Sequence, residues 1–219
     1  MSEFTLHCFG ESGNSYKAAL MLELSGCDWR PAFVAFFDGA TRKIDWRDTL
    51  NEMGEAPVLI HAGQTLTQSG VILDYLAEVT GRFGGRTPAE TREIWRWILF
   101  DNHKFTSYFA TLRFLLGLKK FPESPVTEFL RSRVIAAYEV VERRLEKTSF
   151  LIGDRPTIAD LSLVGYCYYT EDCGLDRWKL FPAIDAWRQR IATLPGWKAP
   201  YDLMPTAPTP VDAADGVAH

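Results

Sequence analysis

The chain has 219 residues, of which 47% are hydrophobic, and its 24 Lys and Arg against 28 Asp and Glu give a formal net charge of -4. This is the composition of a globular protein with a full core, without the basic excess that nucleic-acid binding requires. No apolar run approaches the roughly 20 residues that span a bilayer, and the N-terminus has no basic segment followed by a long apolar one. We therefore expect a cytoplasmic protein with no nucleic-acid or membrane partner.

The first part of the chain predicts strand, helix and strand in turn. Residues 4–9 alternate between two faces as in a strand, and residues 15–24 follow with a helical pattern. Gly26 stands where a helix C-cap belongs. The apolar run 32–37 predicts a second, buried strand, and a loop then leads to a short irregular helix within 44–53.

The next segment predicts a hairpin followed by a helix. Val58–Ile60 and Thr65–Thr67 read as strands joined by a turn at Ala62–Gly63. Ser69 precedes a helical pattern, and its hydroxyl is the natural N-cap. The order βαβ followed by ββα predicts a compact four-stranded sheet covered by helices.

No strand pattern recurs after the glycine- and arginine-rich segment 81–88. Residues 89–118 predict a helix with two apolar stripes and a polar interruption at 101–104, residues 126–145 predict a surface helix, and residues 183–194 predict a final one. We expect the following divisions: a domain at 1–80, a linker at 81–88, an all-helical domain at 89–204 and a disordered tail at 205–219.

The segment Gly153–Leu163, with the sequence GDRPTIADLSL, contains a capping box. Thr157 is the expected cap, and Asp160 lies three residues on, where its carboxylate can reach back to the Thr157 amide. The apolar run that follows predicts a buried central helix.

The cysteines and histidines show no metal or redox pattern. The four cysteines form no C-x-x-C pair, and the four histidines share no metal-ligand spacing. The sequence therefore predicts no metal site and reduced, buried cysteines at Cys8, Cys27, Cys167 and Cys173.

Three segments, in this order, resemble the cytosolic glutathione transferase family: ESGNSYKAAL at 11–20, Ala56-Pro57 leading to Gln68-Ser69, and GDRPTIADLSL. The likeness covers about residues 3 to 200 and is closest to serine-type, bacterial theta- or zeta-like members. It implies an α/β thioredoxin-like N-terminal domain, an all-α C-terminal domain and a homodimer. Glutathione is then the co-substrate.

The resemblance assigns the glutathione site residue by residue. Pro57 matches the family's cis-proline, and the backbone of Ala56 matches the group that pairs with the cysteinyl part of glutathione. Gln68 and Ser69 match the pair that holds the γ-glutamyl carboxylate, at a helix N-terminus that favours anions. The residues alone leave open that Ser69 serves only as a helix cap.

The resemblance places the thiolate-stabilising hydroxyl on Ser12, in the loop after the first strand. A hydroxyl donor and a helix N-terminus at Asn14 or Ser15 would both favour the thiolate, which is the reactive form. Ser15 and Tyr16 are competing candidates, and the residues alone leave open that Ser12 serves only as a helix cap.

The contact for the glycyl carboxylate is less well marked. Glu55 stands where many family members have a basic or neutral residue, and Arg42 or Lys43 are candidate replacements. Asp101 resembles the acidic residue that reaches the γ-glutamyl amine across the dimer interface in relatives. Core packing is the default for five aromatic residues of the first long helix, but about two of them are expected to line a pocket for an apolar electrophile between the domains. The five are Trp95, Trp97, Phe105, Tyr108 and Phe109.

These residues favour a glutathione transferase that activates the glutathione thiolate for attack on an apolar electrophile. A glutathione-dependent isomerase is an alternative, because SGNSYK also resembles the isomerase branch, although Asn14 replaces the cysteine of that motif. A non-catalytic binding or scaffold module with the same fold is the alternative from another class.

Overall fold

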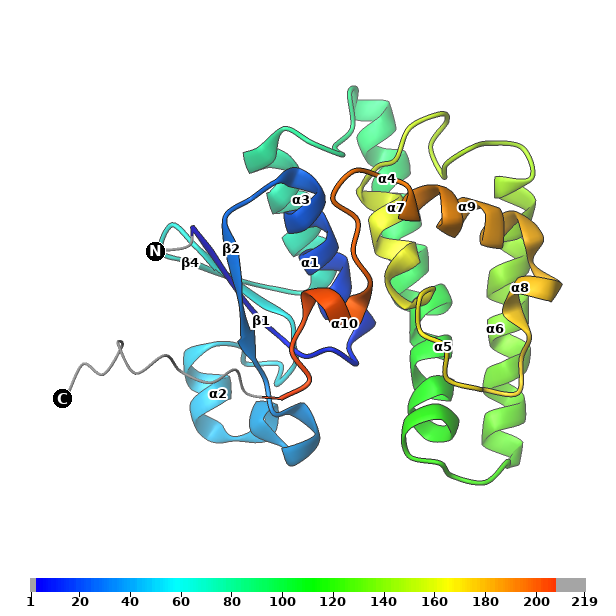
Figure 1. Ribbon diagram of the computed structural model, residues 1–219, viewed down its shortest axis with the longest axis horizontal. Helices are drawn as coiled ribbons and strands as arrows, with labels where there is room; N and C mark the ends of the chain where they lie inside the picture. The colour runs from blue at the N-terminus through cyan, green and yellow to red at the C-terminus, as the bar shows by residue number, and fades with distance from the viewer. Residues whose placement is uncertain (1–2, 208–219) are drawn as a thin grey trace.

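The computed structural model describes residues 3–207, and Figure 1 shows the strands gathered on one side and a bundle of helices on the other. The strands are β1 (Phe4–Cys8), β2 (Trp29–Phe33), β3 (Val58–His61) and β4 (Gln64–Thr67). They form one sheet in the order β2-β1-β3-β4, in which β1 pairs parallel with β2 and antiparallel with β3. The predicted four-stranded sheet and its hairpin are confirmed.

Two helices cover the face of this sheet that is turned toward the helical half. Helix α1 (Gly13–Ser25) connects β1 to β2, and α3 (Ser69–Thr80) follows β4. Figure 1 shows both between the sheet and helices α4 and α7. Gly26 closes α1 in the left-handed conformation at φ 71°, as the sequence predicts. This arrangement is the expected thioredoxin-like fold, and it directs the N-terminus of α1 toward the second half.

The prediction of a buried strand at 32–37 is wrong in both position and burial. Strand β2 begins three residues earlier, and none of its residues is buried. Its place at the edge of the sheet explains both facts, because an edge strand is covered on fewer sides and tolerates Pro31, which has no amide proton. Residues Phe36–Asp38 form a 3-10 turn instead, and α2 (Ile44–Thr49) follows.

The predicted helix at 89–118 is one continuous helical rod with two irregular stretches. Helix α4 (Pro88–Phe100) leads into a π-helical segment, Asp101–Phe105, at the predicted polar interruption. Helix α5 (Thr106–Leu112) follows and ends in a second π-helical segment, Arg113–Leu118. Helix α6 (Pro125–Leu145) then runs back beside α5.

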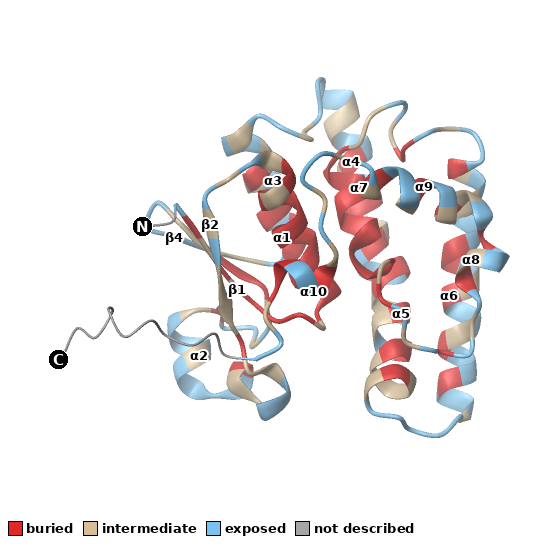
Figure 2. Ribbon diagram, viewed as in Figure 1, coloured by how far each residue is buried: buried red, intermediate tan, exposed pale blue. Residues whose placement is uncertain are grey.

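The central helix α7 (Ile158–Leu163) is buried along its whole length (Figure 2). The predicted capping box is confirmed: Thr157 Oγ1 accepts from the Ala159 amide, and Asp160 Oδ2 accepts from the Thr157 amide at 2.9 Å. Asp160 Oδ1 also accepts from the Trp187 indole at 2.9 Å. A 3-10 turn, Val164–Tyr166, continues α7 and faces α1.

The last helices are α8 (Arg177–Leu180), α9 (Pro182–Ala192) and α10 (Pro200–Leu203). Helix α10 returns to the first half and packs on α1 (Figure 1). The predicted tail at 205–219 begins too early, because Pro205 O accepts from the Gly10 amide at 2.8 Å. The remainder of that prediction, from residue 208 on, lies outside the described residues.

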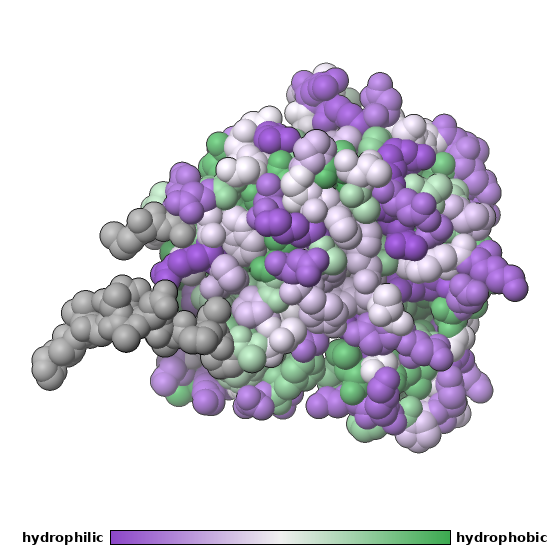
Figure 3. Space-filling view, in the orientation of Figure 1, coloured by the Kyte–Doolittle hydropathy of each residue, from purple (hydrophilic) through white to green (hydrophobic). Residues whose placement is uncertain are grey.

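The surface shown in Figure 3 is mixed, with hydrophilic residues spread over it and hydrophobic ones in small groups between them. No helix within residues 3–207 is both long enough and apolar enough to cross a membrane. Three of the four cysteines are buried, and Cys27 is partly exposed.

Candidate functional site

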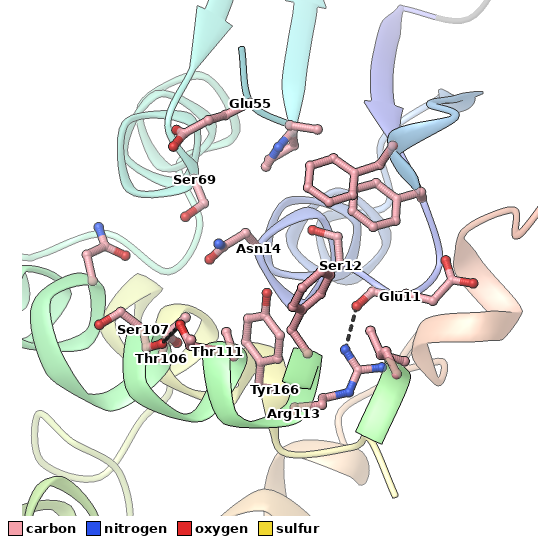
Figure 4. Close-up of a pocket in the computed structure, with 18 of the residues that line it drawn as sticks. Glu11, Ser12, Asn14, Glu55, Ser69, Thr106, Ser107, Thr111, Arg113 and Tyr166 are labelled. Carbon is pink, nitrogen blue, oxygen red and sulfur yellow. Dashed lines mark hydrogen bonds between the residues drawn. The ribbon is translucent and has the colours of Figure 1, made fainter. Parts of the chain in front are cut away.

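A cavity of about 440 Å³ lies between the two halves, a size typical of small-molecule sites. Most of the residues that the sequence predicts for a glutathione site line it, and Figure 4 shows them from both halves. The sheet-containing half contributes Phe9, Glu11, Ser12, Asn14, Phe36, Phe37, Glu55, Ala56, Pro57, Gln68 and Ser69. The helical half contributes Asn102, Thr106, Ser107, Ala110, Thr111, Arg113, Phe114, Leu118 and Tyr166.

Ser12 both caps helix α1 and lines the cavity. Its Oγ accepts a hydrogen bond from the Ser15 amide at 3.1 Å. A hydroxyl has one proton to donate, and no group among the described residues accepts it from Ser12. The two readings of Ser12, cap and donor, are therefore compatible, and the N-terminal end of the α1 dipole adds a positive potential at the same place.

The two competing residues point elsewhere. Ser15 is fully buried and does not line the cavity. The Tyr16 hydroxyl donates to the Lys198 carbonyl at 2.8 Å, and burial raises the pKa of this phenol far above its ordinary value. Of the three candidate hydroxyls, Ser12 is the one in the cavity.

The loop that presents Ser12 is held by groups from the helical half. Arg113 Nη1 donates to the Glu11 carbonyl at 2.7 Å, the bond drawn in Figure 4. The Tyr169 hydroxyl donates to the Gly10 carbonyl, also at 2.7 Å. These contacts span more than a hundred residues of sequence, so no local pattern could have identified them.

The Arg113 side chain is held in place by its neighbours, and its positive charge is paired with the Glu171 carboxylate. Its side chain is 2% exposed, lies 3.9 Å above the Tyr169 ring and donates through Nε to Glu171 at 2.8 Å. Burial favours the neutral form of Glu171, but the hydrogen bonds and charge of Arg113 hold the pKa of this carboxyl below its ordinary value. Arg113 therefore brings a paired charge to the cavity and positions the Ser12 loop.

The Ala56–Pro57 bond is cis, as the resemblance implied. Among the described residues, no group hydrogen-bonds to the amide or carbonyl of Ala56, which lines the cavity. Both backbone groups are available to a peptide-like ligand.

The expectation that Ser69 is the N-cap of α3 is wrong. Ser69 is the first helical residue, and Gln68 takes the cap position with φ 66° and no capping side-chain bond. The Ser69 hydroxyl is therefore free of the capping role and turns toward the cavity in Figure 4. The amides of the first turn of α3, with the positive end of the helix dipole, can bind an anion beside it.

Of the two residues predicted near the glycyl carboxylate, Glu55 and Lys43, only Glu55 lines the cavity. Glu55 lines the cavity, where its Oε2 accepts from Gln68 Nε2 at 2.8 Å. Lys43 is exposed and lies outside the cavity lining, as does Arg42, so neither replaces the missing basic residue there. The second carboxylate of the lining belongs to Glu11.

The expectation that Asp101 reaches a ligand across a subunit interface is wrong. Its side chain is 0% exposed and pairs with the equally buried Lys17 at 2.6 Å. Ser162 donates to the same oxygen of Asp101, and Thr106 donates to the other at 2.5 Å. Asp101 thus links α1 to the helical half. Both of its carboxylate oxygens are already hydrogen-bonded and buried, so neither is accessible to a ligand.

None of the five aromatic residues proposed for an electrophile pocket lines the cavity. Phe105, for example, stacks on Tyr138 inside the helical bundle. The aromatic residues of the lining come from the ends of elements: Phe9, Phe36, Phe37, Phe114 and Tyr166. Phe9 and Phe36 stack with ring centroids 4.7 Å apart, forming an apolar wall near Ser12.

Within residues 3–207 no group of three or more His, Cys, Asp and Glu side chains is arranged to hold a metal ion. The lining of the cavity combines hydroxyls, side-chain amides, the carboxylates of Glu11 and Glu55, free backbone groups at two helix N-termini and an aromatic wall. The helix N-termini suit an anionic group of a peptide-like ligand, and the aromatic wall suits an apolar ligand beside it.

Comparison with known proteins agrees with this geometry. The family model for the glutathione S-transferase N-terminal domain matches residues 2–78, and that for the C-terminal domain matches residues 124–190. Glutathione S-transferase GST-4.5 of Xanthomonas campestris is 30% identical over 74% of this chain and 81% of its own. Maleylacetoacetate isomerase of Rhizobium meliloti is 30% identical over 84% and 90%. A solved glutathione S-transferase from Pseudomonas fluorescens superposes with a TM-score of 0.86 at 29% identity, covering 92% of this chain and all of the other.

Proposed function

Because this chain belongs to the glutathione S-transferase family, we propose that it binds glutathione in the cavity, stabilises its thiolate with Ser12 and conjugates it to an apolar electrophile. One observation carries the proposal: the Ser12 hydroxyl accepts a hydrogen bond but has no acceptor for its own proton among the described residues. It lines the same cavity as Ser69 and the backbone of Ala56, whose amide and carbonyl are free. Serine in this role makes the chain a serine-type member.

Binding positions the thiol before any chemistry occurs. The γ-glutamyl carboxylate is held at the N-terminus of α3 by Gln68, Ser69 and free amides. The cysteinyl part pairs with the backbone of Ala56 in the manner of a short strand pair. Asn14, which turns toward the cavity beside Ser69 in Figure 4, contributes a further polar contact.

Activation follows from the position of Ser12. A free cysteine thiol has a pKa of about 8.5, so only a few per cent is ionised at neutral pH. A hydrogen bond from the Ser12 hydroxyl and the dipole of α1 both favour the thiolate, and the thiol proton passes to solvent. The thiolate sulfur then forms a bond to a carbon of the electrophile, and the electron pair of the bond that breaks at this carbon leaves with the displaced group or stays on another atom of the electrophile. Holding both reactants in one cavity supplies much of the rate enhancement.

The isomerase alternative has one specific point in its favour, the 30% identical maleylacetoacetate isomerase among the relatives. Against it, the lining carries the carboxylates of Glu11 and Glu55, while the charge of Arg113 is paired with Glu171. Apart from the helix N-termini that glutathione would occupy, the described lining offers an acidic second substrate no unpaired cation. Conjugation of a neutral electrophile is therefore the function we favour.

A cytoplasmic homodimer accompanies this proposal as an expectation from the family. The non-catalytic alternative, a binding or scaffold module, differs from the proposal in one measurable respect. A module would be retained on immobilised glutathione without turning over any electrophile.

The test combines retention on immobilised glutathione with conjugation of a generic aromatic electrophile, using wild type and Ser12→Ala. We expect retention of both proteins and strong loss of turnover in the variant. Retention without turnover in wild type would support the non-catalytic module, and turnover that is the same in both proteins would remove Ser12 from the mechanism.

A further inference from the structure

Tyr166 brings a phenol from the helical half to the place where Ser12 acts. It ends the 3-10 turn that continues the buried helix α7, is 8% exposed and lines the cavity. In Figure 4 its hydroxyl points toward the first turn of α1, where Ser12 and Asn14 lie. The function proposed above gives this residue no role.

The backbone is shaped to allow this approach. A Cβ on Gly13 would lie 2.3 to 2.5 Å from ring atoms of Tyr166, and one on Gly165 would lie 2.7 Å from the Gly13 carbonyl oxygen. Both distances are too short for any side chain, so each position admits only glycine. The ring of Tyr166 therefore lies directly on the first turn of α1.

The Tyr166 hydroxyl has a proton to give. Among the described residues no group accepts it, and the Gly13 and Asn14 backbone amides that face this oxygen are themselves donors. Burial raises the pKa of the Tyr166 phenol, and the smaller opposing effects of Arg113 and of the Asn14 and Gly13 amides do not reverse this. The phenol is consequently neutral at physiological pH and acts as a hydrogen-bond donor.

The other hydroxyls on the helical side of the cavity have committed their protons. Thr106 donates to Asp101 at 2.5 Å, Ser107 to the His103 carbonyl at 2.9 Å and Thr111 to the Ser107 carbonyl at 2.8 Å. These three present lone pairs to a ligand.

Two nitrogen donors lie near the cavity but serve other parts of it. The Asn102 amide nitrogen is 3.4 Å from the Cβ position of Gly70, beside the N-terminus of α3. The Lys119 ammonium is exposed at the rim, 5.4 Å from the centroid of the Phe37 ring. Tyr166 is thus the hydroxyl of the described helical wall that can donate close to Ser12.

We propose that Tyr166 is a second catalytic hydroxyl, which donates to the oxygen of the electrophile that gains negative charge when the thiolate attacks. This inference rests on the proposed function and narrows its substrate class. It favours electrophiles whose bonding electrons end on oxygen, namely epoxides and α,β-unsaturated carbonyls, over halides. A departing halide is stabilised by water and needs no proton.

The step with an epoxide balances as follows. The thiolate sulfur forms a bond to one ring carbon, the bond from that carbon to oxygen breaks, and its electron pair stays on the oxygen. The Tyr166 proton passes to this alkoxide, which is more basic than a phenolate. Solvent then returns to the Tyr166 oxygen the proton that the glutathione thiol released.

The test compares two electrophiles that share a phenyl ring, styrene oxide and benzyl bromide, with wild type, Tyr166→Phe and Tyr168→Phe. Tyr166→Phe keeps the ring on Gly13 and removes only the hydroxyl. Tyr168→Phe is the matched control, because the Tyr168 hydroxyl donates to the Arg188 carbonyl at 2.7 Å and Tyr168 does not line the cavity.

We expect Tyr166→Phe to lower kcat for the epoxide by about 10²-fold, the cost of losing one donor to a developing oxyanion, and to leave the bromide rate near wild type. The pKa of the bound glutathione thiol should not change, and Tyr168→Phe should resemble wild type with both substrates. An equal loss with both electrophiles, or no loss with either, would overturn the proposal. Absence of turnover with both in wild type would instead contradict the proposed function on which it rests.

Discussion

The Ser12 hydroxyl accepts a hydrogen bond from the Ser15 amide at 3.1 Å, and both residues belong to the start of α1. The same Ser12 side chain thus caps the N-terminus of α1 and has a hydroxyl proton available for a hydrogen bond in the cavity. The bond to Ser15 uses a lone pair and leaves the proton free, so the proposed function assigns stability and activity to different parts of the same hydroxyl.

Ser12→Ala should therefore have two separable effects. Turnover should fall by about 10² to 10³-fold if the hydroxyl stabilises developing negative charge, and the free energy of unfolding should fall by about 1 kcal/mol through loss of the cap. Steady-state kinetics and denaturant unfolding measure the two. Thr87→Ala is the matched control, because Thr87 caps α4 through the Glu90 amide at 3.2 Å, away from the cavity. Equal losses of activity in the two variants would show that only helix stability matters.

Ser69→Ala should weaken glutathione binding and leave stability nearly unchanged. Since Ser69 is not the cap of α3, its replacement removes no capping bond. A hydrogen bond to a charged group contributes about 1.5 to 3 kcal/mol, so Kd should rise about tenfold or more. Calorimetric titration with glutathione measures this, and a lower unfolding free energy at unchanged Kd would return Ser69 to a purely structural role.

Asp101→Asn should lower stability more than glutathione affinity. The substitution leaves the Lys17 ammonium buried without its counter-charge, a situation that costs about 3 to 5 kcal/mol. Adding Lys17→Met removes the stranded charge and should recover part of the loss in denaturant unfolding. A large loss of affinity with normal stability would instead make Asp101 a ligand contact.

The Arg113–Glu171 pair should make the protein sensitive to acid. A carboxyl whose pKa is lowered on folding contributes stability that is fully present above its unfolded pKa and is lost as pH falls through the folded value. For Glu171, with an ordinary value of 4.5, the window lies below about pH 4.5. Glu171→Gln should flatten the thermal stability profile in this range, and an unchanged acid profile would show that the pair contributes nothing.

Local sequence signals predicted the elements that local interactions determine. Thr157 and Asp160 cap α7 as their spacing indicates, and Gly26 ends α1 with a positive φ. The hairpin turn at Ala62–Gly63 follows the same logic. These features depend on a few neighbouring residues, so the chain itself specifies them.

The errors concern residues whose position depends on distant parts of the chain. The resemblance assigned Asp101 to a ligand contact across the dimer interface, because its actual partner, Lys17, lies on a different helix 84 residues away in the sequence. The sequence predicted Ser69 as the cap of α3, but the cap position belongs to Gln68. The backbone at Gln68 adopts φ 66°, which residue type alone does not indicate.

The role of Tyr166 was missed for a related reason. Its signal in the sequence is a pair of glycines, Gly13 and Gly165, far apart in the chain and meaningful only once α1 and the turn after α7 are in contact. Ser12, which the resemblance singled out, lines the cavity, whereas the aromatic wall depends on how distant elements pack against one another.

The most direct test of the central claim is a pH titration of the glutathione thiol bound to the protein, followed by the ultraviolet absorbance of the thiolate. With wild type, the midpoint should lie clearly below the value of about 8.5 that is usual for a free thiol. With Ser12→Ala it should move back toward that value while glutathione remains bound. An identical midpoint in the two proteins would contradict thiolate stabilisation by Ser12.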